Sequence, residues 1–397
     1  MNVVVPAQVA VVAALVGMSV ATPTLTSPIV PEVPESETAT LLVTGEMLIH
    51  PRVSNKAAQY AAGTGADYDF TPMFQQVEPL IQAADLALCH LEVQLGVPDV
   101  PVAGWPRIAA PGEFAESLAQ AGFDGCSTAS NHANDQGDIG VHSTIDVLDA
   151  AGVGHTGTAK TEPVSPGVLY QLDGLTIGHL SYTWAVQAHK RAHPWSISKI
   201  DAAVILDEAA TLKRMGAEFV AVSLHWGNEF QHRPSRSQRT LADTLTASPN
   251  VDLIVGHHAH VLQPVEYVNG KVVLYGLGNF LSNQAPDCCG VESGDGAAVL
   301  LRLVKEDGEW MVADLEYVPT WVHRRAGGYL VKPTATWESA DQARRALRAS
   351  LQRSEEALTI AGSSRSGLTV AEGVAWLRRM PGFNPMTSQL DGRRLIL

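Results

Sequence analysis

The sequence has few cysteines, and their spacing provides no scaffold. Its 397 residues contain four, too few and too scattered for a disulfide-built fold, and none of the spacings is that of a Cys-x-x-Cys zinc knuckle. Adjacent cysteines bond to each other only under strain. We therefore expect Cys288 and Cys289 not to pair with one another, although either can pair elsewhere in an oxidising compartment.

Runs of Lys or Arg are also missing. The formal net charge is -14 at pH 7, and neutralising the phosphates of a nucleic acid needs a basic face, so we expect no nucleic-acid partner. The sequence contains neither the Gly-x-Ser-x-Gly elbow of serine hydrolases nor a Gly-x-x-x-x-Gly-Lys phosphate loop. An acidic chain of this kind can still bind phosphate groups through a metal ion.

Long apolar runs are missing except at the start of the chain. Val3 to Ala21 is almost wholly apolar or small and ends in a small-x-small pattern, so we interpret residues 1–21 as an export signal. Because this run contains no Lys or Arg, an uncleaved membrane anchor is the alternative. Residues 22–39, rich in Pro, Ser and Thr, are interpreted as a linker. These features predict an extracytoplasmic protein, secreted or membrane-anchored.

The rest of the chain alternates apolar strand patterns with helical ones. Thr40–Thr44, Leu86–Cys89 and Phe219–Leu224 are each followed by polar residues and, further on, by a helical pattern. This order is typical of a layered α/β fold. We expect one main domain over residues 40–332 and a helical C-terminal extension over residues 333–397.

The most informative stretch is Val251 to Gln284. An apolar strand that breaks at Gly256 is followed by His257, His258 and His260, on a loop past a strand's carboxyl end, where α/β proteins keep their chemistry. Neutral imidazole is the commonest protein ligand of metal ions. We therefore interpret the stretch as a metal site; the alternative is that these histidines only cap a loop.

Polar residues follow the other strands in the same way. The strand-end set consists of Glu46, His90, Glu92, Asn131, His132, His225, His258 and His260. Oxygen and nitrogen ligands in this number suit two divalent ions such as Mn, Fe or Zn better than one structural zinc. Two such ions close together can activate water and hold a phosphoryl group. The set therefore predicts metal-assisted hydrolysis.

Successive motifs resemble those of a known family. They are Gly45-Glu46, His90-Leu91-Glu92, Ser130-Asn131-His132 with Asp135, His225-Trp226-Gly227, Gly256-His257-His258-Ala259-His260 and Gly278-Asn279-Phe280. In this order they are similar to the motifs of the CapA-type poly-gamma-glutamate capsule synthesis proteins, a branch of the calcineurin-like metallophosphoesterase superfamily. The resemblance covers about Leu41 to Tyr317. It implies a four-layer α/β/β/α sandwich and an extracytoplasmic role in making, anchoring or releasing an anionic cell-surface polymer.

The resemblance also implies a role for each site residue. Two divalent metals would lie at the strand ends between the sheets. The ligands of one would be Glu46 and His260, those of the other Asn131, His225 and His258, and the bridge Glu92. His132 corresponds to the catalytic acid of the superfamily's Asn-His pair. The possible additional site residues are His90, His257 and Asp135.

Two positions depart from the family's usual pattern. The first motif is usually Gly-Asp, and Glu46 is one methylene longer, which displaces its metal unless the strand end shifts. The family also commonly has Asn where this chain has His90. Both substitutes remain capable ligands, so the departures bear on turnover more than on metal binding.

Two functions fit these residues. One is a di-metal hydrolase acting on a phosphoester or a related bond in an envelope polymer. The other is a non-catalytic protein of the same fold that binds the polymer or membrane-bound synthase subunits. His132 beside a full ligand set favours the hydrolase, since a pure binder needs no proton donor there. The acidic composition also disfavours tight binding of polyglutamate without metals.

Overall fold

The computed structural model describes most of the chain between residues 37 and 359. The described ranges are 37–162, 166–187, 193–324, 328–334, 341–359, 389–390 and 393–394. The predicted export signal or anchor, nearly all of the predicted linker and residues 360–388 lie outside them. Among the described residues, no helix combines the length and apolar character needed to cross a membrane.

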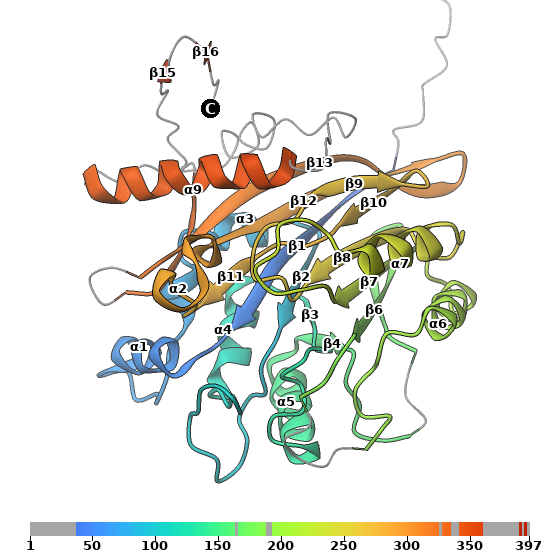
Figure 1. Cartoon of the computed structure of the whole chain (residues 1–397). Helices are drawn as coiled ribbons and strands as arrows, with labels where there is room; N and C mark the ends of the chain where they lie inside the picture. The colour runs from blue at the N-terminus through green and yellow to red at the C-terminus, as the bar shows by residue number, and fades with distance from the viewer. Residues whose placement is uncertain are drawn as a thin grey trace, which may run out of the picture. The chain divides into compact units, whose positions relative to one another are not determined.

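Two β-sheets form the centre of the fold (Figure 1). The first has the order β14-β13-β12-β1-β2-β3-β4, with β11 paired to the end of β1. Its strands are β1 (Thr38–Leu48), β2 (Leu86–Leu91), β3 (Gly125–Ser127), β4 (Gly154–Thr156), β11 (Asn279–Ser282), β12 (Asp295–Glu306), β13 (Glu309–His323) and β14 (Leu330–Pro333). Strands β1 to β4 are parallel, so their carboxyl ends lie at one edge of the sheet.

The second sheet has the order β5-β6-β7-β8-β10-β9. Its strands are β5 (Val168–Leu172), β6 (Leu175–Thr183), β7 (Phe219–His225), β8 (Leu253–His257), β9 (Val265–Val268) and β10 (Lys271–Leu274). Strands β6, β7, β8 and β10 are parallel. The Asn269-Gly270 pair, which predicts a tight hairpin, joins β9 to β10 with both residues at positive φ.

Alternating side chains along the strands build separate cores on the two faces of each sheet. Leu41 and Val43 of β1 pack between the sheets, against residues such as Phe219 and Leu253 of the second sheet. Leu42, between them in sequence, belongs to the core on the outer face of the first sheet. Because successive strand residues point to opposite faces, β1 contributes side chains both to the core between the sheets and to the core under the helices.

Helices cover the two outer faces. The first sheet's outer core includes apolar residues of α1 (Pro51–Ala61), α2 (Thr71–Phe74), α3 (Glu78–Gln82), α4 (Glu113–Ala121) and α5 (Asp138–Ala151). The second sheet's outer core includes residues of α6 (Ala202–Arg214) and α7 (Arg236–Thr246). Asp201 caps α6, and Ser235 with Gln238 forms a capping box on α7. The predicted α/β/β/α sandwich is confirmed.

The C-terminal extension contributes helix α9 (Asp341–Thr359) to the described residues. Figure 1 shows α9 alongside β13, and its Ala357 and Leu358 belong to the core that lies between the sheets. The guanidinium of Arg353 donates to Asp295 at the start of β12, with Nε to Oδ2 at 2.6 Å and Nη2 to Oδ1 at 2.7 Å. Short segments complete the description: α8 (Pro286–Cys289), the 3-10 turn η1 (Val291–Gly294), β15 (Gln389–Leu390) and β16 (Arg393–Arg394).

The cysteines pair in a way that the sequence analysis did not expect. Cys288 and Cys289 are bonded to each other, so the expectation that they would not pair was wrong. Both lie in α8, where successive side chains are about 100° apart around the axis rather than on opposite faces as in a strand. Cys89 and Cys126, which face each other on β2 and β3, form the second pair.

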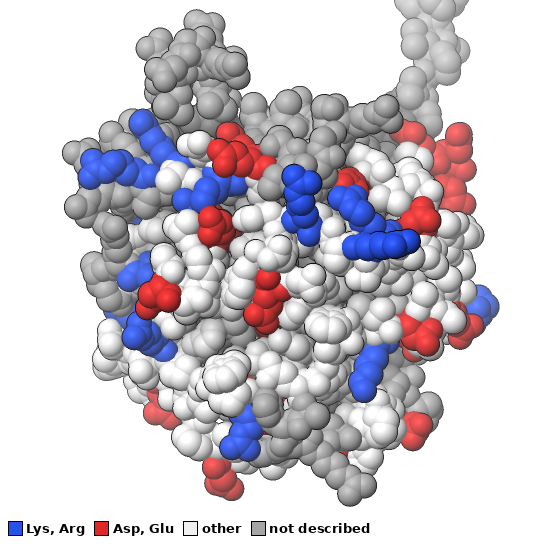
Figure 2. Space-filling view, viewed as in Figure 1, with Lys and Arg blue, Asp and Glu red and all other residues white. Residues whose placement is uncertain are grey.

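Charged side chains are mixed on the surface. On the face drawn in Figure 2, Lys and Arg side chains alternate with Asp and Glu among neutral residues. Neither sign of charge alone therefore covers this face of the described part.

Candidate metal centre

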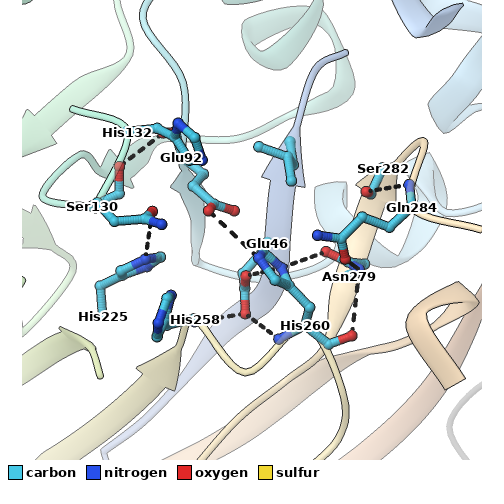
Figure 3. Close-up of polar contacts among 12 residues, drawn as sticks. Glu46, Glu92, Ser130, His132, His225, His258, His260, Asn279, Ser282 and Gln284 are labelled. Carbon is cyan, nitrogen blue, oxygen red and sulfur yellow. Dashed lines mark hydrogen bonds and ion pairs between the residues drawn. The ribbon is translucent and has the colours of Figure 1, made fainter. Parts of the chain in front are cut away.

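The polar residues predicted from the strand ends come together where the parallel strands of both sheets end. The first sheet supplies the carboxylates and the second sheet most of the histidines, and Figure 3 shows them facing a common space. The buried residues in this group are Glu46, His90, Glu92, Asn131, His132, His225, His257, His258 and His260. The site is therefore a junction between sheets rather than a feature of one loop.

Glu46 lies where strand β1 becomes irregular. The pairing register of β1 shifts between Val43 and Glu46 on the β2 side and between Glu46 and Met47 on the β11 side. A Cβ on Gly45 would clash with the backbone carbonyls of Leu277 and Gly278, so a side chain there would push β1 away. The longer side chain of Glu46 thus coincides with a shift of the strand end. Such a shift can compensate for the extra methylene, which would otherwise displace the metal.

The turn that carries the histidines encloses the Glu46 carboxylate. His258 and His260 have φ angles of 91° and 54°, a region that non-glycine residues adopt rarely and often at functional sites. This geometry directs the backbone N–H of His258 to Glu46 Oε1 at 2.7 Å and that of His260 to the same atom at 3.4 Å. The ring Nδ1 of His260 lies 2.6 Å from Glu46 Oε2. Glu46 is therefore fixed by the turn it faces.

Glu92 is fully buried, and neither of its carboxylate oxygens has a hydrogen-bond partner among the described residues. Nε2 of His260 lies 3.7 Å from Glu92 Oε1. Burial raises the pKa of Glu92 to about 7, against the lowering effect of His260. Burial would lower the pKa of His260, but Glu46 and Glu92 raise it to about 10. Burial also opposes ionisation of Glu46, whose pKa is nevertheless lowered by His260.

This cluster fits a divalent cation. Ligand atoms of Glu46, Glu92 and His260 all lie within 4.8 Å of one another. A buried carboxylate without donors costs several kcal/mol unless a charge compensates it, and carboxylate oxygens with imidazole nitrogen form a usual donor set for Mn, Fe or Zn. His258 adds a buried Nδ1 that has no hydrogen-bond partner in the part of the chain that the structure describes. The residues present therefore match a metal better than a closed polar network.

The second half of the site gathers around His225 at the end of β7. His225 Nε2 lies 3.0 Å from Asn131 Oδ1, and its ring centroid lies 4.6 Å from that of His258. Burial lowers the pKa of His225 far below its ordinary value and that of His258 to about 4. Both rings are thus neutral, the form that binds metals. Asn131, His225 and His258 therefore lie next to one another.

His90 and His257 lie behind the candidate ligands. His90 Nε2 is 2.9 Å from His225 Nδ1, and His90 Nδ1 is 2.7 Å from the Ser127 hydroxyl. His257 stacks on His90 with centroids 4.0 Å apart. Like His225, neither belongs to a group of three or more candidate ligands among the described residues. Their position is that of support, since a partner on Nδ1 leaves Nε2 of His225 to face the site.

His132 is held by Asp135. Its Nδ1 lies 2.7 Å from Asp135 Oδ2, which also accepts the backbone N–H of Ile108 at 2.6 Å. Burial would lower the pKa of His132, but the hydrogen bond to Asp135 and the charges of Glu92 and Asp135 raise it. Nε2 of His132 points to Gln187, whose Nε2 is 3.5 Å away. Asp135 is thus placed to orient His132 rather than to bind a metal.

Some residues near the site were missed from the sequence. Glu229 has a carboxylate oxygen within 4.8 Å of ligand atoms of His258 and His260. Asn279 Oδ1 lies 3.2 Å from His260 Nδ1, and Gln187 adjoins His132. Asn279 could have been predicted as a site residue, because it follows an apolar strand in the Gly278-Asn279 motif. Gln187 and Glu229 lie in loops whose sequence contains no pattern that indicates a site.

Solved structures that resemble this chain, at low similarity, include a phosphatase and a phosphoesterase. A phosphatase from Mycoplasma pneumoniae has a TM-score of 0.42 and 12% identity, over 72% of this chain and 94% of that one. A calcineurin-like phosphoesterase from Bacillus subtilis has a TM-score of 0.41 and 14% identity, over 81% and 98%. The fold assigned above therefore rests on the strand order and layers of this chain itself.

Relatives in sequence carry names from capsule and polyglutamate synthesis. "Capsule biosynthesis protein CapA" of Bacillus anthracis is 27% identical over 262 residues, 63% of this chain and 61% of the relative. "PGA biosynthesis protein CapA" of Bacillus subtilis is 31% identical over 227 residues, 53% and 57%. A "Probable polyglutamine synthesis accessory protein" of Mycobacterium tuberculosis is 26% identical over 178 residues, 40% and 45%. The chain spans less than two thirds of the length of each of these relatives.

A family model covers the strands that build the site. The model described as "Bacterial capsule synthesis protein PGA_cap" matches residues 40–284, more than half of the chain. This range runs from β1 through β11 and includes all the candidate ligands. The resemblance found in the motifs is confirmed: the chain belongs to the bacterial capsule synthesis protein family PGA_cap.

Proposed function

We propose that this chain is an extracytoplasmic accessory protein of anionic polymer synthesis, of the capsule or polyglutamate type, and that it hydrolyses a phosphoester or a related bond. The hydrolytic part requires a pair of divalent ions such as Mn, Fe or Zn. The observation that carries it is Glu92, a fully buried carboxylate that lies next to Glu46 and His260 and receives no hydrogen bond from the described residues.

The ligands follow from the two halves of the site. The residues that would hold one ion are Glu46, Glu92 and His260, and those that would hold the other are Glu92, Asn131, His225 and His258. When bound, the ions offset the negative charge on a phosphoryl oxygen and lower the pKa of the water that they bind. His90 contributes by fixing the ring of His225 through the 2.9 Å contact, and Ser127 fixes His90 in turn.

His132 is the proton donor in this proposal. Asp135 retains the proton on Nδ1, so the ionised ring carries its second proton on Nε2. A water oxygen bonds to phosphorus and loses a proton to solvent as the bond to the leaving oxygen breaks. The leaving oxygen keeps the bonding electrons and takes the Nε2 proton of His132, which leaves a neutral imidazole hydrogen-bonded to Asp135. The raised pKa of His132 supports the charged starting form, and such a group contributes roughly 10²- to 10⁴-fold.

A non-catalytic role is the second candidate. The printed names of the relatives refer to biosynthesis and to accessory function, not to hydrolysis. In this alternative the same surface binds the anionic polymer or membrane-bound synthase subunits. The extracytoplasmic location belongs to both candidates and depends on residues 1–21 acting as an export signal or anchor.

A comparison of metal content and turnover separates the candidates. Purified protein would be loaded with Mn²⁺, Zn²⁺ or Fe²⁺ and tested on an aryl phosphate, an aryl phosphodiester and polymer fragments. Hydrolysis by the wild type that falls at least roughly 10²-fold in His132→Ala, with metal content unchanged, supports the hydrolase. Full metal occupancy without turnover on any of these substrates would reject it and leave the binding role.

A further inference from the structure

Glu229 lies beside the candidate ligands but outside the motifs that predicted them. It is exposed, and it comes from the loop after β7, the strand that ends in His225. One of its carboxylate oxygens lies within 4.8 Å of ligand nitrogens of both His258 and His260. The other two carboxylates of the site, Glu46 and Glu92, are completely buried, so Glu229 approaches from the solvent side.

Backbone contacts hold Glu229 in this place. The N–H of Trp226 donates to the carbonyl of His257 at 3.1 Å, and the N–H of Phe230 donates to the carbonyl of Ala259 at 2.8 Å. These two bonds, one before and one after Glu229 in sequence, join its loop to the histidine turn. Phe230 also has a φ of 59°, a conformation that costs an aromatic residue energy and persists only where the surroundings impose it.

A second observation points to a cation between these groups. His258 is nine-tenths buried or more, and its Nδ1 has no hydrogen-bond partner among the described residues. A buried imidazole nitrogen without a hydrogen-bond partner can present its lone pair to a cation. A neutral imidazole and a carboxylate within reach of each other form a donor set for a divalent cation.

We propose that Glu229 is a third carboxylate ligand of the metal pair, reaching it from the solvent side beside His258 and His260. The inference depends on the proposed function only in requiring that divalent cations bind at the Glu46, Glu92 and His260 cluster. Two divalent ions carry more positive charge than two carboxylates offset. A third carboxylate reduces this excess without neutralising it, and so leaves an anionic substrate attracted to the site.

The test is the affinity of the full chain for Mn²⁺, measured by titration calorimetry and by metal content after gel filtration. Glu229→Gln keeps the size of the side chain and removes its charge. We expect it to bind Mn²⁺ at least roughly tenfold more weakly than the wild type, in line with the 10- to 100-fold effects of groups that support a metal. Glu229→Asp, which keeps the charge but shortens the reach, should lie between them.

Glu309→Gln is the matched control, because Glu309 is an exposed glutamate in the hairpin between β12 and β13. It should bind Mn²⁺ as the wild type does. Circular dichroism in EDTA should show all four proteins equally folded, since Glu229 is exposed and the metal is absent.

The outcomes separate this proposal from the proposed function. Wild-type affinity and stoichiometry in Glu229→Gln would overturn the role of Glu229 and leave the other ligands standing. No Mn²⁺, Zn²⁺ or Fe²⁺ binding by the wild type would overturn both proposals. Weaker binding by Glu229→Gln, in a wild type that hydrolyses nothing, would support Glu229 as a ligand and reject only the hydrolase.

Discussion

Replacing Glu92 with glutamine should make the stability of the metal-free protein less dependent on pH. In the folded chain, burial raises the pKa of Glu92 to about 7, from an ordinary value of 4.5. Below pH 4.5 the carboxyl is protonated whether the chain is folded or not. Between 4.5 and 7 only the unfolded chain releases the proton, so the folded state loses stability as the pH rises. Above pH 7 the full cost is present, about 3 kcal/mol.

The assay is urea unfolding in EDTA at pH 5 and pH 8, for the wild type and Glu92→Gln. The stability of the variant relative to the wild type should rise by about 2–3 kcal/mol between these pH values. Comparing two pH values cancels the constant cost of a buried amide without partners. Mn²⁺ at pH 8 should then stabilise the wild type much more than the variant. A difference between the two proteins that is the same at both pH values would refute the reasoning about Glu92.

The other predictions concern the ligands, the acid and the location. His225→Ala and His258→Ala should each lower metal content with the circular dichroism spectrum unchanged, because they lie at strand ends and outside the apolar cores; unchanged occupancy in both would place the metals elsewhere. In a chain active on an aryl phosphate, His132→Ala should retain its metals and lose roughly 10²- to 10⁴-fold in turnover, and equal losses of metal and turnover would contradict its role as an acid. Glu46→Asp, which restores the carboxylate usual in the family, should keep or raise activity if the length of Glu46 limits turnover; a loss of metal would show that the shifted end of β1 needs the longer side chain. Cell fractionation should recover the native protein outside the cytoplasm, and recovery from the cytosol would reject the export signal.

The layered fold and most of the site could be predicted because parallel strands bring their carboxyl ends to one edge. Each apolar run ends in a polar residue, so Glu46, Glu92 and His225 could be read from the sequence one strand at a time. The His258-Ala259-His260 turn added the strongest signal. The place where residues of the two sheets meet could not be derived strand by strand, since it depends on how the sheets pack together. Only the motif resemblance predicted that these residues form one site.

The missed features depend on loops and on contacts distant in sequence. His90 lies near the end of β2, two residues before Glu92, and only the 2.9 Å contact with His225 shows that it lies behind the ligands. Glu229 and Gln187 have no periodic pattern, because a loop's path is set by the elements it touches. The bond between Cys288 and Cys289 was mispredicted. The prediction was based on the strain of a bond between adjacent cysteines and did not include the helical turn in which both lie.

The position of β1 inside the first sheet has a consequence for how the chain folds. Thr38 to Thr44 pair with Val304 to Ala298 of β12, at the other end of the domain in sequence. All the strands of the second sheet lie between, within residues 168–274, and can pair with one another before β12 exists. Closing so long a loop slows folding. A chain shortened before Asp295 would therefore keep the histidine turn but leave the Thr38–Thr44 edge of β1 open to association with other chains, while Glu46 keeps its pairing with β11 and β2.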